Sequence, residues 1–87
     1  MAVVWIPSLM RDLTGGKETI EVNGTTVGEV IEAVNQIFPG FSARIRDSQG
    51  LRRGIAVAVD THVARFGLAE PVSPASEVHF VAAIAGG

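Results

Sequence analysis

The chain has 87 residues, of which 47% are apolar and 18% are charged, which predicts a single globular domain over residues 1–87 and excludes an intrinsically disordered chain. Its net charge of −2 provides no general attraction to nucleic acids or anionic membranes, so neither is expected as a partner. The absence of cysteine excludes disulfide bonds, thiolate metal sites and a cysteine nucleophile, and it fits a cytoplasmic protein.

The N-terminal residues predict two strands joined by a long loop. Residues 2–7 form an apolar, β-branched run ending in Pro7, and this run lacks the basic flank and the length of a signal peptide or membrane span. Turn residues follow at 13–16. Residues 17–23 then alternate in polarity, which places Ile20 and Val22 on one face of a second strand.

Residues 26–38 give the strongest local signal, which is that of an amphipathic helix. Thr26 and Glu29 form a capping-box pattern at its start, and Pro39 with Gly40 ends it. The apolar residues expected on one helical face are Val27, Val30, Ile31, Val34, Ile37 and Phe38. Such a helix must lie against a sheet.

The second half of the chain predicts three further strands. Residues 41–53 are expected to be an irregular connector with one helical turn at 42–45. Strands are expected over residues 55–59, 62–66 and 77–84, with a tight turn at Asp60-Thr61 and a loop over 67–76. The element order predicts an α+β fold of the β-grasp, or ubiquitin-like, type, with a mixed sheet of four or five strands and one main helix packed on one face.

Strand alternation predicts an apolar sheet face that the helix leaves uncovered. If Val4 and Ile6 face the helix, Trp5 points to the opposite side. The same alternation in the later strands leaves Ala56, Ala58, His79 and Val81 on that side. Exposed apolar patches of this kind mark protein interfaces, whereas a different register of the first strand would place Trp5 in the core.

Other motifs give little support to catalysis. Gly15-Gly16-Lys17 lacks the first glycine and the final Ser or Thr of a phosphate-binding loop, and no serine stands in a Gly-x-Ser-x-Gly sequence. His62 and His79 are interpreted as polar strand-face residues, because no cysteine is available as a further ligand and the sequence does not show carboxylates converging on either. Four basic residues gather in the connector, as a solvated loop or as a contact for an acidic partner: Arg44, Arg46, Arg52 and Arg53.

The sequence ends in Ala85-Gly86-Gly87, directly after the last predicted strand. Two terminal glycines occur by chance in roughly one chain in two hundred at average composition. Glycine has no Cβ atom, so a flexible tail over residues 83–87 could enter a channel that is too narrow for side chains. The terminal carboxylate is therefore a candidate substrate for another enzyme.

Together these features resemble the ubiquitin-like sulfur carriers typified by MoaD and ThiS, over essentially the whole chain. The resemblance rests on the Ile6-Pro7 opening, the Leu-Thr-Gly-Gly loop at 13–16, the helix, the strand over 54–60 and the terminal diglycine. The opening and the loop look most like the CysO-type, or MoaD-like, carriers of cysteine biosynthesis.

The resemblance implies a protein substrate rather than an enzyme. A ThiF/MoeB-type adenylating enzyme would use ATP to convert the Gly87 carboxylate to an acyl-adenylate, and a sulfur donor would convert this to a thiocarboxylate, with Gly86 as the flexible neighbour. No bound cofactor or metal is expected. The implied sulfur acceptor is a cysteine synthase-like enzyme, or else the large subunit of molybdopterin synthase or a thiazole synthase-like enzyme.

Docking of these partners is assigned to the open sheet face and the tail, through Trp5, Ala58, His79, Val81, Ala83, Ile84 and Ala85. Two other functions stay open. Gly87 could be conjugated to lysines of target proteins, as in ubiquitin-like modifiers, or the chain could be a plain β-grasp binding module with an incidental diglycine.

Overall fold

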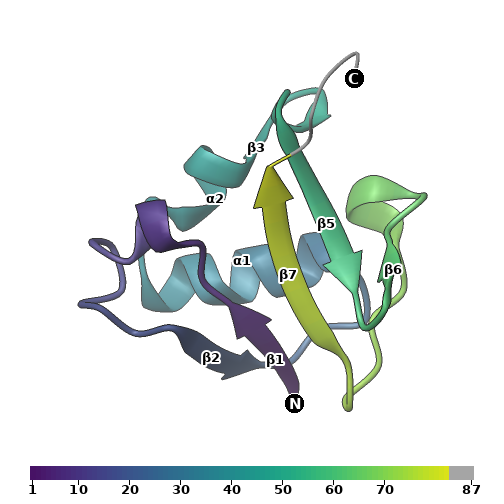
Figure 1. Cartoon of the computed structure of the whole chain (residues 1–87), viewed down its shortest axis with the longest axis horizontal. Helices are drawn as coiled ribbons and strands as arrows, with labels where there is room; N and C mark the ends of the chain where they lie inside the picture. Colours follow the sequence, from purple (N-terminus) through teal and green to yellow (C-terminus); the bar gives the residue numbers. More distant parts are fainter. Residues whose placement is uncertain (83–87) are drawn as a thin grey trace.

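The computed structural model describes residues 1–82 and shows a two-layer α+β fold (Figure 1). The main sheet consists of β1 (Ala2–Trp5), β2 (Thr19–Val22), β5 (Ile55–Val59), β6 (His62–Val63) and β7 (Glu77–Ala82). A separate hairpin is formed by β3 (Arg46–Asp47) and β4 (Gly50–Leu51). The helices are α1 (Val27–Ile37) and α2 (Phe41–Ile45), with short 3-10 helices η1 (Ser8–Met10) and η2 (Gly67–Ala69). The predicted tail and the last two residues of the predicted final strand lie outside the described residues.

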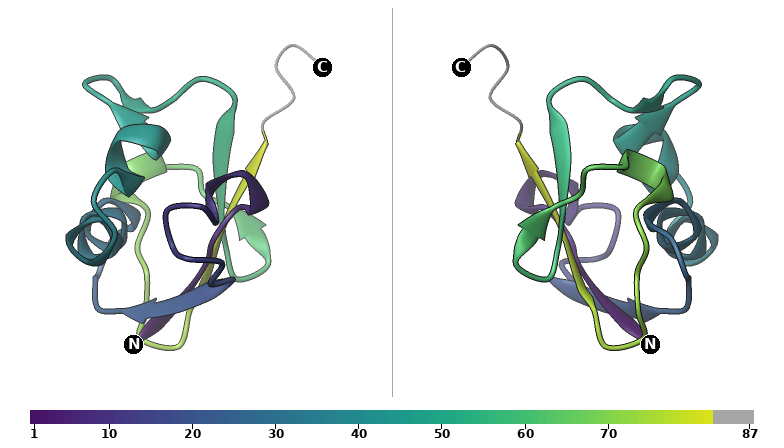
Figure 2. Two further views of the ribbon diagram at one scale, coloured as in Figure 1. Left: turned by 90° about the vertical axis from the view of Figure 1, so that its left-hand side faces the viewer. Right: turned by 90° about the vertical axis from the view of Figure 1, so that its right-hand side faces the viewer.

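The main sheet is mixed, with the strand order β2-β1-β7-β5-β6. The first and last strands, β1 and β7, pair in parallel at its centre, and the other pairs are antiparallel. Figure 2 shows that α1 and α2 both lie on one side of this sheet and that neither covers the opposite side. The arrangement confirms the predicted β-grasp fold.

Helix α1 begins where the capping residues predicted it. The Thr26 hydroxyl accepts a hydrogen bond from the backbone N–H of Glu29 at 3.2 Å. The Glu29 carboxylate accepts hydrogen bonds from the backbone N–H and the hydroxyl of Thr25. These two bonds, the backbone one more strongly, lower the pKa of Glu29. The buried residues of α1 are Val27, Val30, Ile31 and Val34, as predicted.

The prediction that Ile37 joins this buried face is wrong, because 54% of the residue is exposed. A helix turns by about 100° per residue, which places Ile37 roughly 80° around the helix from Val27. It is also the last residue of α1, so no further turn of helix shields it. Phe38, by contrast, packs partly buried against the core.

The prediction that residues 41–53 form an irregular connector is also wrong. Phe41 and Ile45 of α2 are buried at 0% and 1% exposure. The Phe41 ring meets Phe80 of β7 edge-on, with ring centroids 5.7 Å apart. The chain then reverses through β3 and β4. The expected helical turn at 42–45 is confirmed, and it contributes to the core.

Two strand boundaries differ from the predicted ones for identifiable reasons. The first strand ends at Trp5, before Pro7, which has no N–H to continue the ladder, and η1 follows. The strand predicted over 62–66 ends at Val63. Backbone N–H groups of Arg65 and Phe66 are bound instead to the carboxylate of Glu70, so they cannot extend the sheet.

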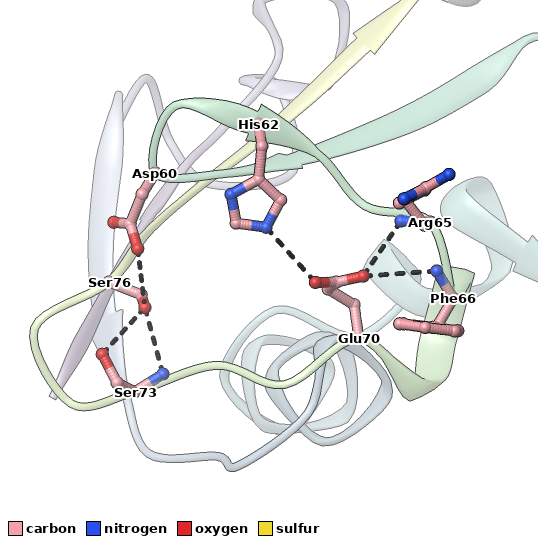
Figure 3. Close-up of polar contacts among 7 residues, drawn as sticks. All are labelled: Asp60, His62, Arg65, Phe66, Glu70, Ser73 and Ser76. Atoms are coloured by element: carbon pink, nitrogen blue, oxygen red, sulfur yellow. Dashed lines mark hydrogen bonds and ion pairs between the residues drawn. The ribbon is translucent and has the colours of Figure 1, made fainter.

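The Glu70 carboxylate organises the loop after β6 (Figure 3). One oxygen accepts hydrogen bonds from the N–H groups of Arg65 and Phe66 at 2.9 and 3.2 Å, and the other lies 3.3 Å from His62 Nε2. Burial alone would raise the pKa of Glu70, but the hydrogen bonds from Phe66, His62 and Arg65 outweigh it. The pKa of Glu70 is therefore lowered.

The turn predicted at Asp60-Thr61 is confirmed, and Asp60 adopts a left-handed backbone conformation with φ of 55°. Its carboxylate accepts hydrogen bonds from the Ser76 hydroxyl at 3.2 Å and the Glu77 backbone N–H at 3.0 Å (Figure 3 shows the first). The turn between β5 and β6 thereby fixes the start of β7, the strand that leads toward the end of the chain.

Acidification is expected to destabilise the protein partly through Glu70. A carboxyl group with a lowered folded-state pKa adds stability above its unfolded pKa, here 4.5, and loses this contribution as the pH falls through the folded pKa. Scanning calorimetry should therefore show the Tm falling below about pH 4.5. The Glu70→Gln variant should have a lower Tm at neutral pH and a smaller further loss in acid, with Glu29 supplying part of what remains. Identical pH profiles for both proteins would contradict this role of Glu70.

Candidate docking face

One row of side chains crosses all five strands on the side of the sheet opposite α1. Adjacent strands pair Thr19 with Trp5, Trp5 with His79, His79 with Ala58, and Ala58 with Val63. Residues directly opposite each other in neighbouring strands point to the same face, so these side chains lie next to one another. Val4 and Ile6 are buried, whereas 37% of Trp5 is exposed. The predicted outward orientation of Trp5 is confirmed.

Trp5 is held by two neighbours on β7. Its indole Nε1–H donates a hydrogen bond to Glu77 Oε1 at 2.9 Å. Its ring stacks on the imidazole of His79, with centroids 5.3 Å apart and planes 10° from parallel. His79 Nε2 in turn lies 3.7 Å from the same Glu77 oxygen. Because the indole is already oriented, less conformational entropy would be lost when a partner covers it.

A second exposed position lies toward the C-terminal end of β7. Val81 pairs with Ala56 of β5, and 45% of Val81 is exposed. The structure thus brings four predicted docking residues together on one face: Trp5, Ala58, His79 and Val81. We call these four residues and Val63 the docking face. The other predicted positions, Ala83, Ile84, Ala85, Gly86 and Gly87, lie outside the described residues.

Sequence reasoning missed Val63 and Glu77. Val63 is 62% exposed and extends the docking face to the edge strand, a position that follows only from its pairing with Ala58. Glu77 was expected only to begin the last strand. Its carboxylate accepts the indole N–H, which depends on the parallel pairing of β1 with β7. A search for carboxylates two residues from His79 would have identified Glu77 as its neighbour on the same face.

The end of the docking face opposite Val81 is acidic. The register places Val3 between Glu21 of β2 and Glu77 of β7, and both carboxylates are exposed. A partner that covers the docking face therefore meets apolar side chains near Val81 and negative charge near Val3. This favours partners with basic groups at the corresponding edge.

The remaining candidate motifs take structural positions. Gly15 and Gly16 have positive φ angles, of 65° and 90°, and form the loop before β2. Ser76 is buried and hydrogen-bonded to Ser73 and Asp60, as Figure 3 shows. Among residues 1–82, no group of three His, Asp or Glu side chains is placed to hold a metal ion. No helix in the described part of the chain has the length and apolar character needed to cross a membrane.

Comparison with known proteins gives consistent matches over the whole chain. The model of the ThiS family matches residues 4–87. The sulfur carrier protein CysO of Mycobacterium tuberculosis is 33% identical, over 97% of this chain and 96% of its own length. A chain in the crystal structure of the BexX/CysO complex of Amycolatopsis orientalis is 35% identical, with a TM-score of 0.90 and 100% coverage of both chains. The crystal structure of M. tuberculosis CysO matches with a TM-score of 0.88 and 29% identity, over 97% of this chain and 100% of that one.

Proposed function

Because the chain belongs to the ThiS family of ubiquitin-like sulfur carriers, we propose that it carries sulfur on the carboxylate of Gly87 for the synthesis of cysteine. The observation that carries the proposal is the match to CysO sulfur carriers over nearly the full length of both chains. The family match extends to Gly87, so the diglycine belongs to the matched region.

The proposed chemistry answers a limitation of the carboxylate. An ionised α-carboxylate, with a usual pKa of about 3.3–3.7, is a poor electrophile. In the first step a Gly87 oxygen attacks the α-phosphorus of ATP, which forms the acyl-adenylate and releases pyrophosphate. In the second step hydrosulfide attacks the acyl carbon, AMP leaves, and a proton is released. The product is a thiocarboxylate, and the chain has no cysteine whose sulfur would compete with it as a nucleophile.

In this proposal the partner enzymes bind the folded domain and supply the catalysis. A ThiF/MoeB-type enzyme binds the ATP and activates Gly87, and a cysteine synthase-like enzyme accepts the sulfur. The docking face supports such a division, because an oriented aromatic side chain on the same face as exposed valines is typical of interface anchors. The large subunit of molybdopterin synthase and a thiazole synthase-like enzyme are the other acceptors to be tested. A relative of this chain is part of the BexX/CysO complex.

A reconstituted reaction tests the proposed pathway. The protein would be incubated with a cognate adenylating enzyme, ATP and isotopically labelled sulfide, and the loaded product would then be given to each candidate acceptor. Carrier-dependent appearance of the label in free cysteine is the expected result. Loading without labelled cysteine would overturn the choice of acceptor. Higher-mass conjugates to lysines of added proteins would instead support a protein modifier.

A charge placed on the docking face is expected to block docking without unfolding the protein. Val81→Glu changes an exposed side chain, so its Tm should stay close to that of the wild type. Since an unpaired charge would be desolvated in an apolar interface, binding to the adenylating enzyme should weaken by about tenfold to a hundredfold. Trp5→Glu should weaken it as well, because the new carboxylate also lies beside Glu77.

The matched control is Ile37→Glu, which introduces the same charge at an exposed position on α1. Calorimetric titration should show wild-type affinity for this control. If the Val81→Glu and Trp5→Glu variants fold, bind and are adenylated like the parent, the docking face is wrongly assigned.

A further inference from the structure

A groove of about 530 Å³ lies beside the C-terminal part of β7, between this strand, α2 and the turn before β5. Its walls are mainly apolar and include Met10, Ile55, Phe80 and Val81. Arg44 and Arg52 supply charge at the same groove. Val81 belongs both to this groove and to the docking face, so the two surfaces are continuous.

The two arginines differ in how their charges are balanced. Arg44 forms a bidentate ion pair with Asp12, in which both N–O distances are 3.2 Å. Arg52 uses its Nε–H to donate to the Ala43 carbonyl at 2.7 Å, and its backbone N–H donates to the Ile45 carbonyl at 2.9 Å. Within residues 1–82, no carboxylate forms an ion pair with Arg52. Arg52 is therefore anchored to α2 while its charge is left for another group.

We propose that this groove binds an acidic segment of the adenylating enzyme, in which an apolar side chain enters the groove and a neighbouring Asp or Glu pairs with Arg52. The inference rests on the proposed function. An apolar slot beside an anchored cation matches such a segment in both shape and charge, although the protein as a whole is acidic. A guanidinium favours carboxylate partners, which it can bind through two parallel hydrogen bonds.

The position of the groove explains why the activating enzyme is its expected occupant. Phe80 and Val81 line it, and Gly87 follows six residues after Val81. Six extended residues span about 20 Å, so an enzyme that acts on Gly87 must approach the molecule at this end. The opposite end of the docking face carries Glu21 and Glu77. Arg52 at the groove end and acidic residues at the other end would favour one orientation of the partner, with its active site toward Gly87.

The test is the dissociation constant of the full-length chain and its cognate adenylating enzyme, measured by calorimetry at two salt concentrations. Arg52→Gln should weaken binding about tenfold and reduce its salt dependence, since one charge-assisted contact is lost. Arg52→Lys keeps the charge but loses the Nε–H bond to Ala43 and cannot bind a carboxylate through two parallel hydrogen bonds, so its affinity should lie between that of Arg52→Gln and that of the wild type. Arg65→Gln removes an exposed arginine from the loop after β6 and is the matched control, expected within about twofold of the wild type.

Several results would overturn the inference. If Arg52→Gln binds like the wild type, the groove proposal fails while the proposed function stands. If the wild type neither binds nor is adenylated, the proposed function fails and the groove proposal with it. If Arg52→Gln instead dissociates a homodimer of the isolated chain in sedimentation, the groove belongs to a second copy. If deletion of residues 83–87 shifts the amide resonances of Met10 and Ala43, which line the groove on the side away from Ala82, the groove belongs to the chain's own end.

Discussion

Removal of Gly87 is expected to abolish sulfur loading by the adenylating enzyme and to leave the fold unchanged. The shortened chain still ends in a carboxylate, on Gly86, but that group lies one residue, about 3.3–3.6 Å, short of its former reach. A misplacement of about 1 Å at a reacting centre can already cost about a hundredfold in rate. Loading of the variant should therefore fall by at least about a hundredfold, as followed by the release of pyrophosphate and by intact mass.

A residue added after Gly87 should have the same effect, because it replaces the reacting carboxylate with a peptide bond. Circular dichroism and Tm should match the wild type in both variants, since residues 1–82 hold the described core. Loading of either variant at the wild-type rate would show that the diglycine is incidental and would favour a plain binding module.

Phe41→Ala is expected to have the largest effect on stability. The side chain is fully buried and packs edge-on against Phe80, which also lines the groove. Truncation of a buried phenylalanine costs about 3–5 kcal/mol. Since a small domain is stable by only about 5–15 kcal/mol, much of the free energy of unfolding would be lost. Urea denaturation with an unchanged m-value would measure this loss directly.

Phe66→Ala is the matched control for Phe41→Ala. It makes the same substitution at a residue that is 69% exposed, so the free energy of unfolding should change by less than about 0.5 kcal/mol. Equal losses at the two positions would contradict the placement of α2 in the core.

The parts of the fold that were predictable from sequence are those with a complete local signal. In α1, a capping residue marks the start and apolar residues recur on one face over three turns. Thr26 is the N-cap and Val27 the first helical residue, as expected. Strand β5, Ile55–Val59, has the predicted bounds because Gly54 precedes it and the turn at Asp60 follows it. Each signal is contained within the segment that it describes.

The parts that were not predictable depend on distant contacts. Helix α2 is a single turn, and Phe41 and Ile45 are too few to show a helical period. Their burial follows from the position of Phe80 on β7, which lies far along the chain. The end of β6 depends similarly on Glu70, whose carboxylate takes the N–H groups that the sheet would have used.

The docking face, too, was partly predictable from local signals and partly dependent on distant contacts. Alternation along each strand was enough to place Trp5, Ala58, His79 and Val81 on the open side of the sheet. Their order across the sheet required the register, which added Val63 and showed that Glu77 receives the Trp5 indole N–H. The groove beside Arg52 combines residues from η1, α2, β5 and β7, and no segment of the sequence contains it.

Sulfur loading on Gly87 is tested most directly by the mass of the full-length protein after incubation with its cognate adenylating enzyme, ATP and sulfide. We expect a mass increase that corresponds to the exchange of one oxygen for one sulfur, and fragmentation should locate it in the C-terminal fragment that contains Gly87. An unchanged mass with an enzyme that binds the protein, or sulfur located in any other fragment, would contradict the claim that Gly87 carries the sulfur.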